Sequence, residues 1–228
     1  MHRNFPIPVR AVMIDLDGTL LDTIPDLAAA TNLMLEALGL APLPLDTVRT
    51  FVGKGIPRLV ERALAGNIDG RADEVAMAQA LPVFERFYTQ VNGRHTTIYP
   101  GVREGLERFR AAGFPLACVT NKAGAFTAPL LERMGLAPYF ALTVAGDTLP
   151  RKKPDPLQLL HACEHFGVTP SQMLMVGDSV NDVQAARAAG CPVFCVPYGY
   201  NEGHAVQNLE VDAIVGALSD CIPLIVKV

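Results

Sequence analysis

Short apolar segments alternate with longer amphipathic segments along most of this 228-residue chain. The apolar segments have the length and composition typical of buried strands, and they cover residues 9–14, 115–119, 141–145, 173–176, 192–196 and 213–215. Between the later ones lie segments of helical periodicity, each followed closely by glycine, at residues 102–112, 125–134, 156–166 and 181–189. This alternation predicts an α/β fold with a doubly wound parallel sheet covered by helices on both faces.

One long interval breaks the alternation. Between the first and second predicted strands, residues 25–92 show helical patterns interrupted by glycine and proline, with no convincing strand pattern. An inserted domain explains such an interval. We therefore expect a Rossmann-like α/β core at residues 1–22 and 95–228, and an α-helical cap domain at residues 23–94.

The composition and charge of the chain limit the classes of molecule that we expect it to bind. The formal net charge is -4 and lysines and arginines do not cluster, which argues against nucleic acid or an anionic membrane as a partner. No apolar stretch reaches the roughly 20 residues that span a bilayer, and the N-terminal segment lacks a signal-peptide core. We expect a cytoplasmic protein, either a monomer or a homodimer.

The five cysteines are odd in number, and several lie in apolar segments. This favours buried, reduced thiols. A metal site built from Cys191, Cys195, His161 and His165 is the alternative, but no Cys-x-x-Cys pair is present to support it. A solvated helix face accounts for the two histidines more simply.

Two carboxylates follow the first predicted strand, in the segment Asp15-Leu16-Asp17-Gly18-Thr19. They would lie beyond the carboxyl end of a parallel strand, where open α/β sheets bind their ligands. One carboxylate can attack an electrophile while the second handles the proton of a leaving oxygen, which suits phosphoryl transfer. The alternative is a structural turn, because turn chemistry alone also selects aspartate and glycine.

Two further polar clusters follow later predicted strands and should converge on Asp15. Thr120 and Asn121 offer a hydroxyl and an amide to phosphate oxygens. Lys152 and Lys153 offer ammonium groups that could neutralise a carboxylate and a phosphoryl group, although an ordinary basic loop would have the same composition.

The segment Gly177-Asp178-Ser179-Val180-Asn181-Asp182 follows the strand predicted at 173–176. Asp178 is placed to ligate a cation, and Asp182 could orient a ligand or a metal-bound water. Helix capping explains Ser179 but leaves Asp178 unexplained. A hard cation such as Mg²⁺ suits a site made of carboxylates, a carbonyl and water.

In this order, the four clusters resemble the four signature motifs of the haloacid dehalogenase-like hydrolase superfamily. The resemblance covers almost the whole chain, including a helical cap inserted after the first motif. It implies an aspartyl-phosphate mechanism in which Asp15 is the nucleophile and Asp17 protonates the leaving alcohol, then activates water. It also implies Mg²⁺ held by the Asp15 carboxylate, the Asp17 backbone carbonyl and Asp178, with Asp182 in support.

The same resemblance assigns the remaining polar groups. Thr120 and Asn121 would hold the transferring phosphoryl group, and Lys153 would neutralise its charge. Lys152 is the neighbouring candidate, and Lys153 is preferred because it directly precedes Pro154.

Resemblance to one group within the superfamily indicates the substrate. Superfamily members that cleave carbon–halogen bonds or phosphonates lack the second carboxylate of the first motif, so Asp17 favours phosphate esters. Residues 15–35, 51–55 and 177–192 most resemble the bacterial subfamily that hydrolyses 2-phosphoglycolate to glycolate and phosphate. A sugar-phosphate mutase and a broad sugar-phosphate or nucleotide phosphatase are the alternatives, and a non-catalytic binding protein of the same fold is the least favoured.

The cap contributes a glycine-flanked segment, Gly53-Lys54-Gly55. Glycine lets the backbone approach a substrate closely, and Lys54 or Arg58 could pair with a substrate carboxylate. The alternative is a plain turn between two cap helices with solvated basic side chains.

Overall fold

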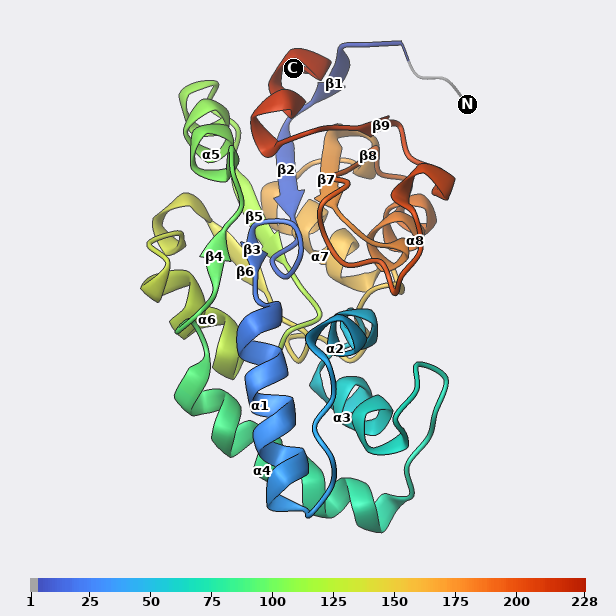
Figure 1. Ribbon diagram of the computed structural model, residues 1–228. Coiled ribbons are helices and arrows are strands. Elements are labelled where there is room, and N and C mark those ends of the chain that lie inside the picture. Colours follow the sequence, from blue (N-terminus) through green and yellow to red (C-terminus); the bar gives the residue numbers. More distant parts are fainter. Residues whose placement is uncertain (1–3) are drawn as a thin grey trace.

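The computed structural model describes residues 4–228 and is built on a six-stranded parallel sheet (Figure 1). The strand order is β6-β5-β2-β7-β8-β9, so the first strand of the sheet lies between two later ones. The bounds are β2 (Ala11–Ile14), β5 (Leu116–Val119), β6 (Leu142–Val144), β7 (Met173–Gly177), β8 (Val193–Cys195) and β9 (Ala213–Ile214). All six predicted strand segments contribute to this sheet.

Helices cover both faces of the sheet because the side chains of each strand alternate between two apolar clusters. Val12 and Ile14 of β2 lie in the cluster that includes residues of α5 (Val102–Ala111) and α6 (Gly124–Arg133). Ala11 and Met13 lie in the cluster that includes residues of α7 (Leu157–Phe166) and α8 (Val180–Ala189). The doubly wound architecture is therefore confirmed.

The first apolar segment is divided between two sheets. β1 (Ile7–Val9) pairs in parallel with β10 (Ile225–Lys227), whereas β2 belongs to the main sheet. Ile7 and Val9 are buried like β2, and the break between the two strands falls at the exposed Arg10. Short 3-10 helices complete the core at Ala137–Tyr139, Pro170–Gln172, Val206–Asn208 and Leu218–Leu224.

Four helices form a second lobe beneath the carboxyl end of the sheet in Figure 1: α1 (Ile24–Ala37), α2 (Leu45–Phe51), α3 (Ile56–Ala65) and α4 (Glu74–Val91). The chain enters them after β3 (Leu21–Asp22) and leaves them before β4 (Thr97–Ile98), and these two strands pair antiparallel. The helices enclose an apolar cluster of their own. The insertion predicted after the first strand is confirmed as a helical cap.

The entry and exit segments of the cap are tied together by a buried carboxylate. Asp26 accepts hydrogen bonds from the backbone N–H groups of Gly93, His95 and Thr96 and from the Thr96 hydroxyl.

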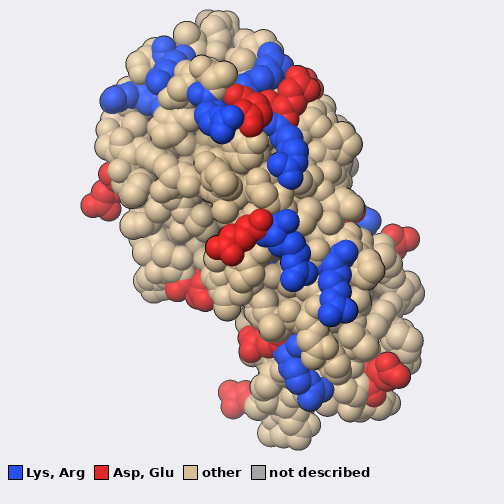
Figure 2. All heavy atoms as spheres, turned by 90° about the vertical axis from the view of Figure 1, so that its left-hand side faces the viewer, with Lys and Arg blue, Asp and Glu red and all other residues tan. Residues whose placement is uncertain are grey.

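Figure 2 shows the face that lies to the left in Figure 1, on which basic and acidic side chains are interspersed over both lobes. Among the helices described, none has the length and apolar character needed to cross a membrane.

Candidate active site

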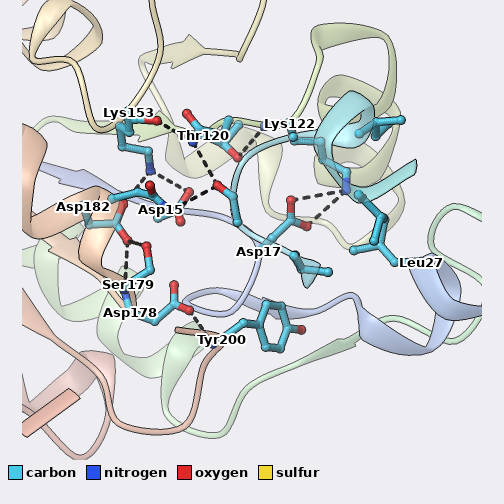
Figure 3. Close-up of a pocket in the computed structure, with 17 residues that line it drawn as sticks. Asp15, Asp17, Leu27, Thr120, Lys122, Lys153, Asp178, Ser179, Asp182 and Tyr200 are labelled. Carbon is cyan, nitrogen blue, oxygen red and sulfur yellow. Dashed lines mark hydrogen bonds and ion pairs between the residues drawn. The ribbon is translucent and has the colours of Figure 1, made fainter. Parts of the chain in front are cut away.

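The polar clusters converge where strands β5, β2 and β7 end (Figure 3). Asp15 follows β2, Thr120 follows β5 and Asp178 follows β7, and neighbouring parallel strands bring their ends to one edge of the sheet. A cavity between this edge and the cap is lined by Asp15, Asp17, Leu27, Val52, Gly53, Gly55, Ile56, Leu59, Thr120, Asn121, Lys122, Lys153, Asp178, Ser179, Asn181, Asp182 and Tyr200.

Asp15 and Lys153 form a buried ion pair at the centre of the cavity. Lys153 Nζ lies 2.9 Å from Asp15 Oδ1, and it donates hydrogen bonds to Asp182 Oδ1 at 2.7 Å and to the Val119 carbonyl at 2.7 Å. Burial alone would lower the pKa of Lys153, but the charges of Asp15 and Asp182 outweigh it and raise this pKa. The lysine is therefore a fixed positive charge beside Asp15.

Burial raises the pKa of the Asp15 carboxyl to about 7, although the nearby ammonium of Lys153 acts to lower this pKa. Asp15 Oδ1 is buried and has no well-directed hydrogen bond among the residues described. The site thus contains a carboxylate with unused capacity to bind a cation or to attack an electrophile.

Asp178 is held rigidly by two donors. The Thr19 hydroxyl donates to Oδ1 at 2.7 Å, and the Tyr200 backbone N–H donates to Oδ2 at 2.6 Å. Gly18 and Gly199 flank the carboxylate so closely that a Cβ on either would overlap Oδ2. Burial, followed by the charges of Asp182 and Asp15, raises the pKa of Asp178 well above its ordinary value.

Asp182 has two roles in the structure. Its Oδ2 accepts hydrogen bonds from the Ser179 backbone N–H and hydroxyl, which completes a capping box at the start of α8. Its Oδ1 accepts from Lys153. Helix capping and site chemistry, which the sequence presents as alternatives, are both served by this one side chain.

Asp15, Asp178 and Asp182 offer carboxylate oxygens that all lie within 4.8 Å of one another. Within residues 4–228, this is the group of acidic, histidine or cysteine side chains that could hold a metal ion. The five cysteines lie among the described residues and are buried, and no disulfide joins them. The predicted metal position at the strand ends is therefore supported, and the alternative built on Cys191 and His161 is not.

Asp17 faces a different lysine. Lys122 Nζ lies 3.1 Å from Asp17 Oδ1 and 3.4 Å from Oδ2, and the Thr23 hydroxyl donates to Oδ1 at 2.8 Å. Lys122 also donates to the hydroxyl of Tyr88 on cap helix α4, at 2.5 Å. The two carboxylates of the first motif are thus paired with two separate ammonium groups (Figure 3).

The predicted phosphate-binding residues also line the cavity. Thr120 is buried, and its hydroxyl accepts a hydrogen bond from the Lys122 backbone N–H. The amide of Asn121 donates to the carbonyls of Lys153 and Gly53, which joins the core to the cap loop. Asn121 Oδ1 is buried and accepts no hydrogen bond from residues 4–228.

The basic candidates of the cap lie elsewhere. Lys54 pairs with Glu202 at 3.4 Å and is partly exposed, and Arg58 pairs with Glu61 and donates to two backbone carbonyls. Both residues are described in the structure, and neither lines the cavity. Gly53 does line it, and Lys152 lies near Gly55 of the cap loop rather than beside Asp15.

Sequence reasoning missed Lys122, Tyr88 and Tyr200. Lys122 directly follows Asn121, so its place at the end of a predicted strand was a usable signal. Tyr88 looks like any apolar position of an amphipathic helix, and Tyr200 lies in a loop after β8 with no motif around it.

Comparison with known proteins places the chain in a family. Residues 9–190 match the model of the haloacid dehalogenase-like hydrolase family. The chain is 59% identical over 224 residues to a phosphoglycolate phosphatase of Nitrosospira multiformis, covering 98% of this chain and 99% of that protein. It is 52% identical to the phosphoglycolate phosphatase of Thiobacillus denitrificans, covering 99% of each chain.

A solved structure agrees with these relatives. The crystal structure of a predicted phosphoglycolate phosphatase from Haemophilus somnus superposes with a TM-score of 0.89 at 33% identity, covering 94% of this chain and 96% of that one. The resemblance recognised from the four motifs is confirmed.

Proposed function

This chain belongs to the haloacid dehalogenase-like hydrolase family, and we propose that it is a phosphoric monoester hydrolase that converts 2-phosphoglycolate to glycolate and phosphate. The observation that carries the proposal is identity of 59% and 52%, over nearly the full chain, to two relatives named phosphoglycolate phosphatase. The buried carboxylates at the strand ends supply groups suited to the reaction.

The first step uses both carboxylates of the first motif. An Asp15 oxygen forms a bond to phosphorus while the bond between phosphorus and the glycolate oxygen breaks. Asp17 gives its proton to that departing oxygen. In the second step Asp17 takes a proton from water, whose oxygen attacks phosphorus, and the bond to Asp15 breaks to restore the free carboxylate.

Positive charge at the site makes the first step feasible. A phosphate dianion and a carboxylate repel each other, and Lys153 lies 2.9 Å from the attacking group to offset that repulsion. We assign Thr120, Asn121 and Lys153 to the binding of the phosphoryl oxygens. The position of the three residues in the cavity lining supports this assignment.

The residues also fit a divalent cation. Three carboxylates within 4.8 Å of one another, two of them with raised pKa values, form an anionic pocket that a cation would stabilise. We propose Mg²⁺, held by the Asp15 and Asp178 carboxylates and the Asp17 carbonyl, with Asp182 as an outer support. Its chemistry would be charge neutralisation on the phosphoryl oxygens.

We propose that the cap segment at residues 23–94 closes over the core formed by residues 1–22 and 95–228. Gly53 lines the cavity and is our candidate for direct contact with the substrate. Lys54 and Arg58 could reach a substrate carboxylate after leaving Glu202 and Glu61.

The test is phosphate release from 2-phosphoglycolate, measured beside a panel of sugar phosphates and nucleotides, each with Mg²⁺ and with a chelator. We expect a Mg²⁺-dependent preference for 2-phosphoglycolate in kcat/KM. Activity spread evenly over other esters would overturn the substrate and keep the mechanism. Isomer formation without free phosphate would identify a mutase instead.

A further inference from the structure

Lys122 is a buried cation whose charge the proposed chemistry does not yet use. Its side chain is 2% exposed, and its ion-pair partner is Asp17, whose side chain is 16% exposed. A buried ammonium is costly to desolvate unless charged and hydrogen-bonding partners compensate the cost. A purely structural contact at this position could be made by an apolar side chain at lower cost.

The three hydrogens of the ammonium find three acceptors. Two are the oxygens of Asp17, and the third is the hydroxyl of Tyr88. The ammonium also lies 4.8 Å from the centroid of the Tyr88 ring. These contacts fix the ammonium against one edge of the Asp17 carboxylate and thereby restrict the rotation of that carboxylate.

Tyr88 belongs to the cap, whereas Lys122 and Asp17 belong to the core. The tyrosine is fully buried in the apolar cluster of the cap and packs against Phe84 and Phe126 at ring distances of 5.5 and 4.9 Å. Phe126 lies on core helix α6, so the Tyr88 ring is held at the boundary between the two lobes. The Lys122 contact therefore depends on where helix α4 sits.

We propose that Lys122 is a positioning residue for Asp17, and that Tyr88 makes this positioning depend on the docking of cap helix α4. The inference rests on the proposed function, because it assumes that Asp17 transfers protons in both steps. Lys122 acts through Asp17, whereas Lys153 acts on Asp15 and the phosphoryl group. Each lysine thus serves one of the two carboxylates.

The test compares Lys122→Met, Lys122→Arg and Tyr88→Phe with the wild-type protein, using 2-phosphoglycolate and Mg²⁺. We expect Lys122→Met to lower kcat by about 10- to 100-fold, less than the roughly 10²- to 10⁴-fold contributed by general acid–base catalysis because Asp17 itself remains, with KM changed less than about threefold. Lys122→Arg should recover part of the loss. Tyr88→Phe keeps the ring and should lower kcat by a smaller factor.

Matched controls are available far from the cavity. Tyr139→Phe removes the hydroxyl that bonds Glu107, and Lys227→Met removes the ammonium that bonds the Gly113 carbonyl. Both should leave kcat unchanged. If Lys122→Met fails to fold, as judged by thermal unfolding, Tyr88→Phe carries the test alone.

A second substrate separates positioning from binding. The phenol of p-nitrophenyl phosphate leaves without needing a proton, so only the second step requires Asp17. In Lys122→Met we expect an initial burst of about one nitrophenol per active site, followed by slow turnover. A raised KM for 2-phosphoglycolate with unchanged kcat in Lys122→Met would overturn the proposal. The absence of a nitrophenol burst in this variant would also overturn it. Because this assay does not use 2-phosphoglycolate, it remains valid even if the proposed substrate is wrong.

Discussion

The two sides of the cavity are built differently. On the core side, Asp15 and Asp178 are buried directly after strands, Lys153 is buried in the loop between β6 and α7, and contacts of 2.6–2.9 Å hold the three residues in place. On the cap side, the lining is mostly apolar and comes from Leu27, Val52, Ile56 and Leu59, with the backbone of the loop at Gly53 and Gly55. Polar chemistry and apolar enclosure are thus contributed by separate lobes.

This difference indicates that the two lobes contribute differently to catalysis and to substrate binding. Side chains at the ends of a packed sheet are preorganised, which benefits a charged transition state. A lobe that encloses an apolar cluster of its own and joins the core at the β3 and β4 segments can move as a unit, and it can exclude water in one step and admit it in the next. Changes to the core side of the cavity lining should therefore act on kcat, and changes to its cap side should act mainly on KM. Tyr88, which does not line the cavity and contacts Lys122, is expected to act on kcat instead.

Replacing the nucleophile should have the largest effect. Asp15→Asn keeps the size of the side chain but removes the attacking charge, and we expect kcat to fall by about 10⁴-fold or more, as for other nucleophiles that act within a catalytic unit. Steady-state phosphate release measures the loss, and thermal unfolding checks that the fold is intact. Substantial activity in the folded variant would show that Asp15 is not the nucleophile.

The acidic cluster should make the metal-free protein sensitive to pH. Asp15 and Asp178 have raised pKa values in the folded protein, about 7 for Asp15 compared with about 4 in the unfolded chain. At pH values between the unfolded and the folded pKa, the folded state binds more protons than the unfolded state. Stability of the metal-free protein should therefore decrease as pH rises through this range. Thermal unfolding at pH 5.5 and pH 8 measures the change.

Asp178→Asn sharpens the same prediction. It removes one repelling charge, so the pH dependence of the metal-free protein should weaken. With Mg²⁺ at about 100 times its dissociation constant, the wild-type protein should gain about 2.7 kcal/mol, or roughly 5–10 °C in Tm, and the variant should gain much less. An equal gain in both proteins would remove Asp178 from the metal site.

A change in the cap loop should have the smallest effect. Gly55 has φ +84°, and an added Cβ would lie 2.7 Å from Lys152 Nζ and 3.2 Å from the Asn121 carbonyl oxygen. Gly55 also has ψ 169°, a backbone region that essentially only glycine adopts, so Gly55→Ala should raise KM by about tenfold, from strain of about 1–3 kcal/mol, and change kcat less. Steady-state kinetics with 2-phosphoglycolate measures both constants.

Gly66→Ala is the control for backbone strain. Gly66 ends helix α3 at φ +69°, in the left-handed region, and no described atom lies within 4 Å of its added Cβ. Gly66→Ala should lower Tm less than Gly55→Ala, because alanine tolerates the left-handed region better than the backbone region of Gly55, and it should leave KM unchanged. A similar rise in KM for both variants would mean that general loosening of the cap, and not the loop at the cavity, controls substrate binding.

The polar groups that directly follow an apolar strand could be placed from the sequence alone. Asp15, Thr120 and Asp178 each follow a short apolar strand, and the rule that parallel strands end at one edge brings them together. The helical insertion was also visible, because its apolar positions follow helical periodicity. The division of residues 9–14 between β1 and β2 was not predicted, because one charged residue, Arg10, within an otherwise apolar segment does not by itself indicate a break between strands.

The sequence by itself determined the fold class, the helical insertion and the acidic cluster, since these depend on local periodicity and on residues within a few positions of a strand end. Only the tertiary structure decided that Asp17 pairs with Lys122, that Tyr88 reaches this pair from the cap, and that Lys54 and Arg58 do not line the cavity. These contacts join residues distant in sequence, and they depend on how the two lobes pack. Periodicity carries no information about that packing.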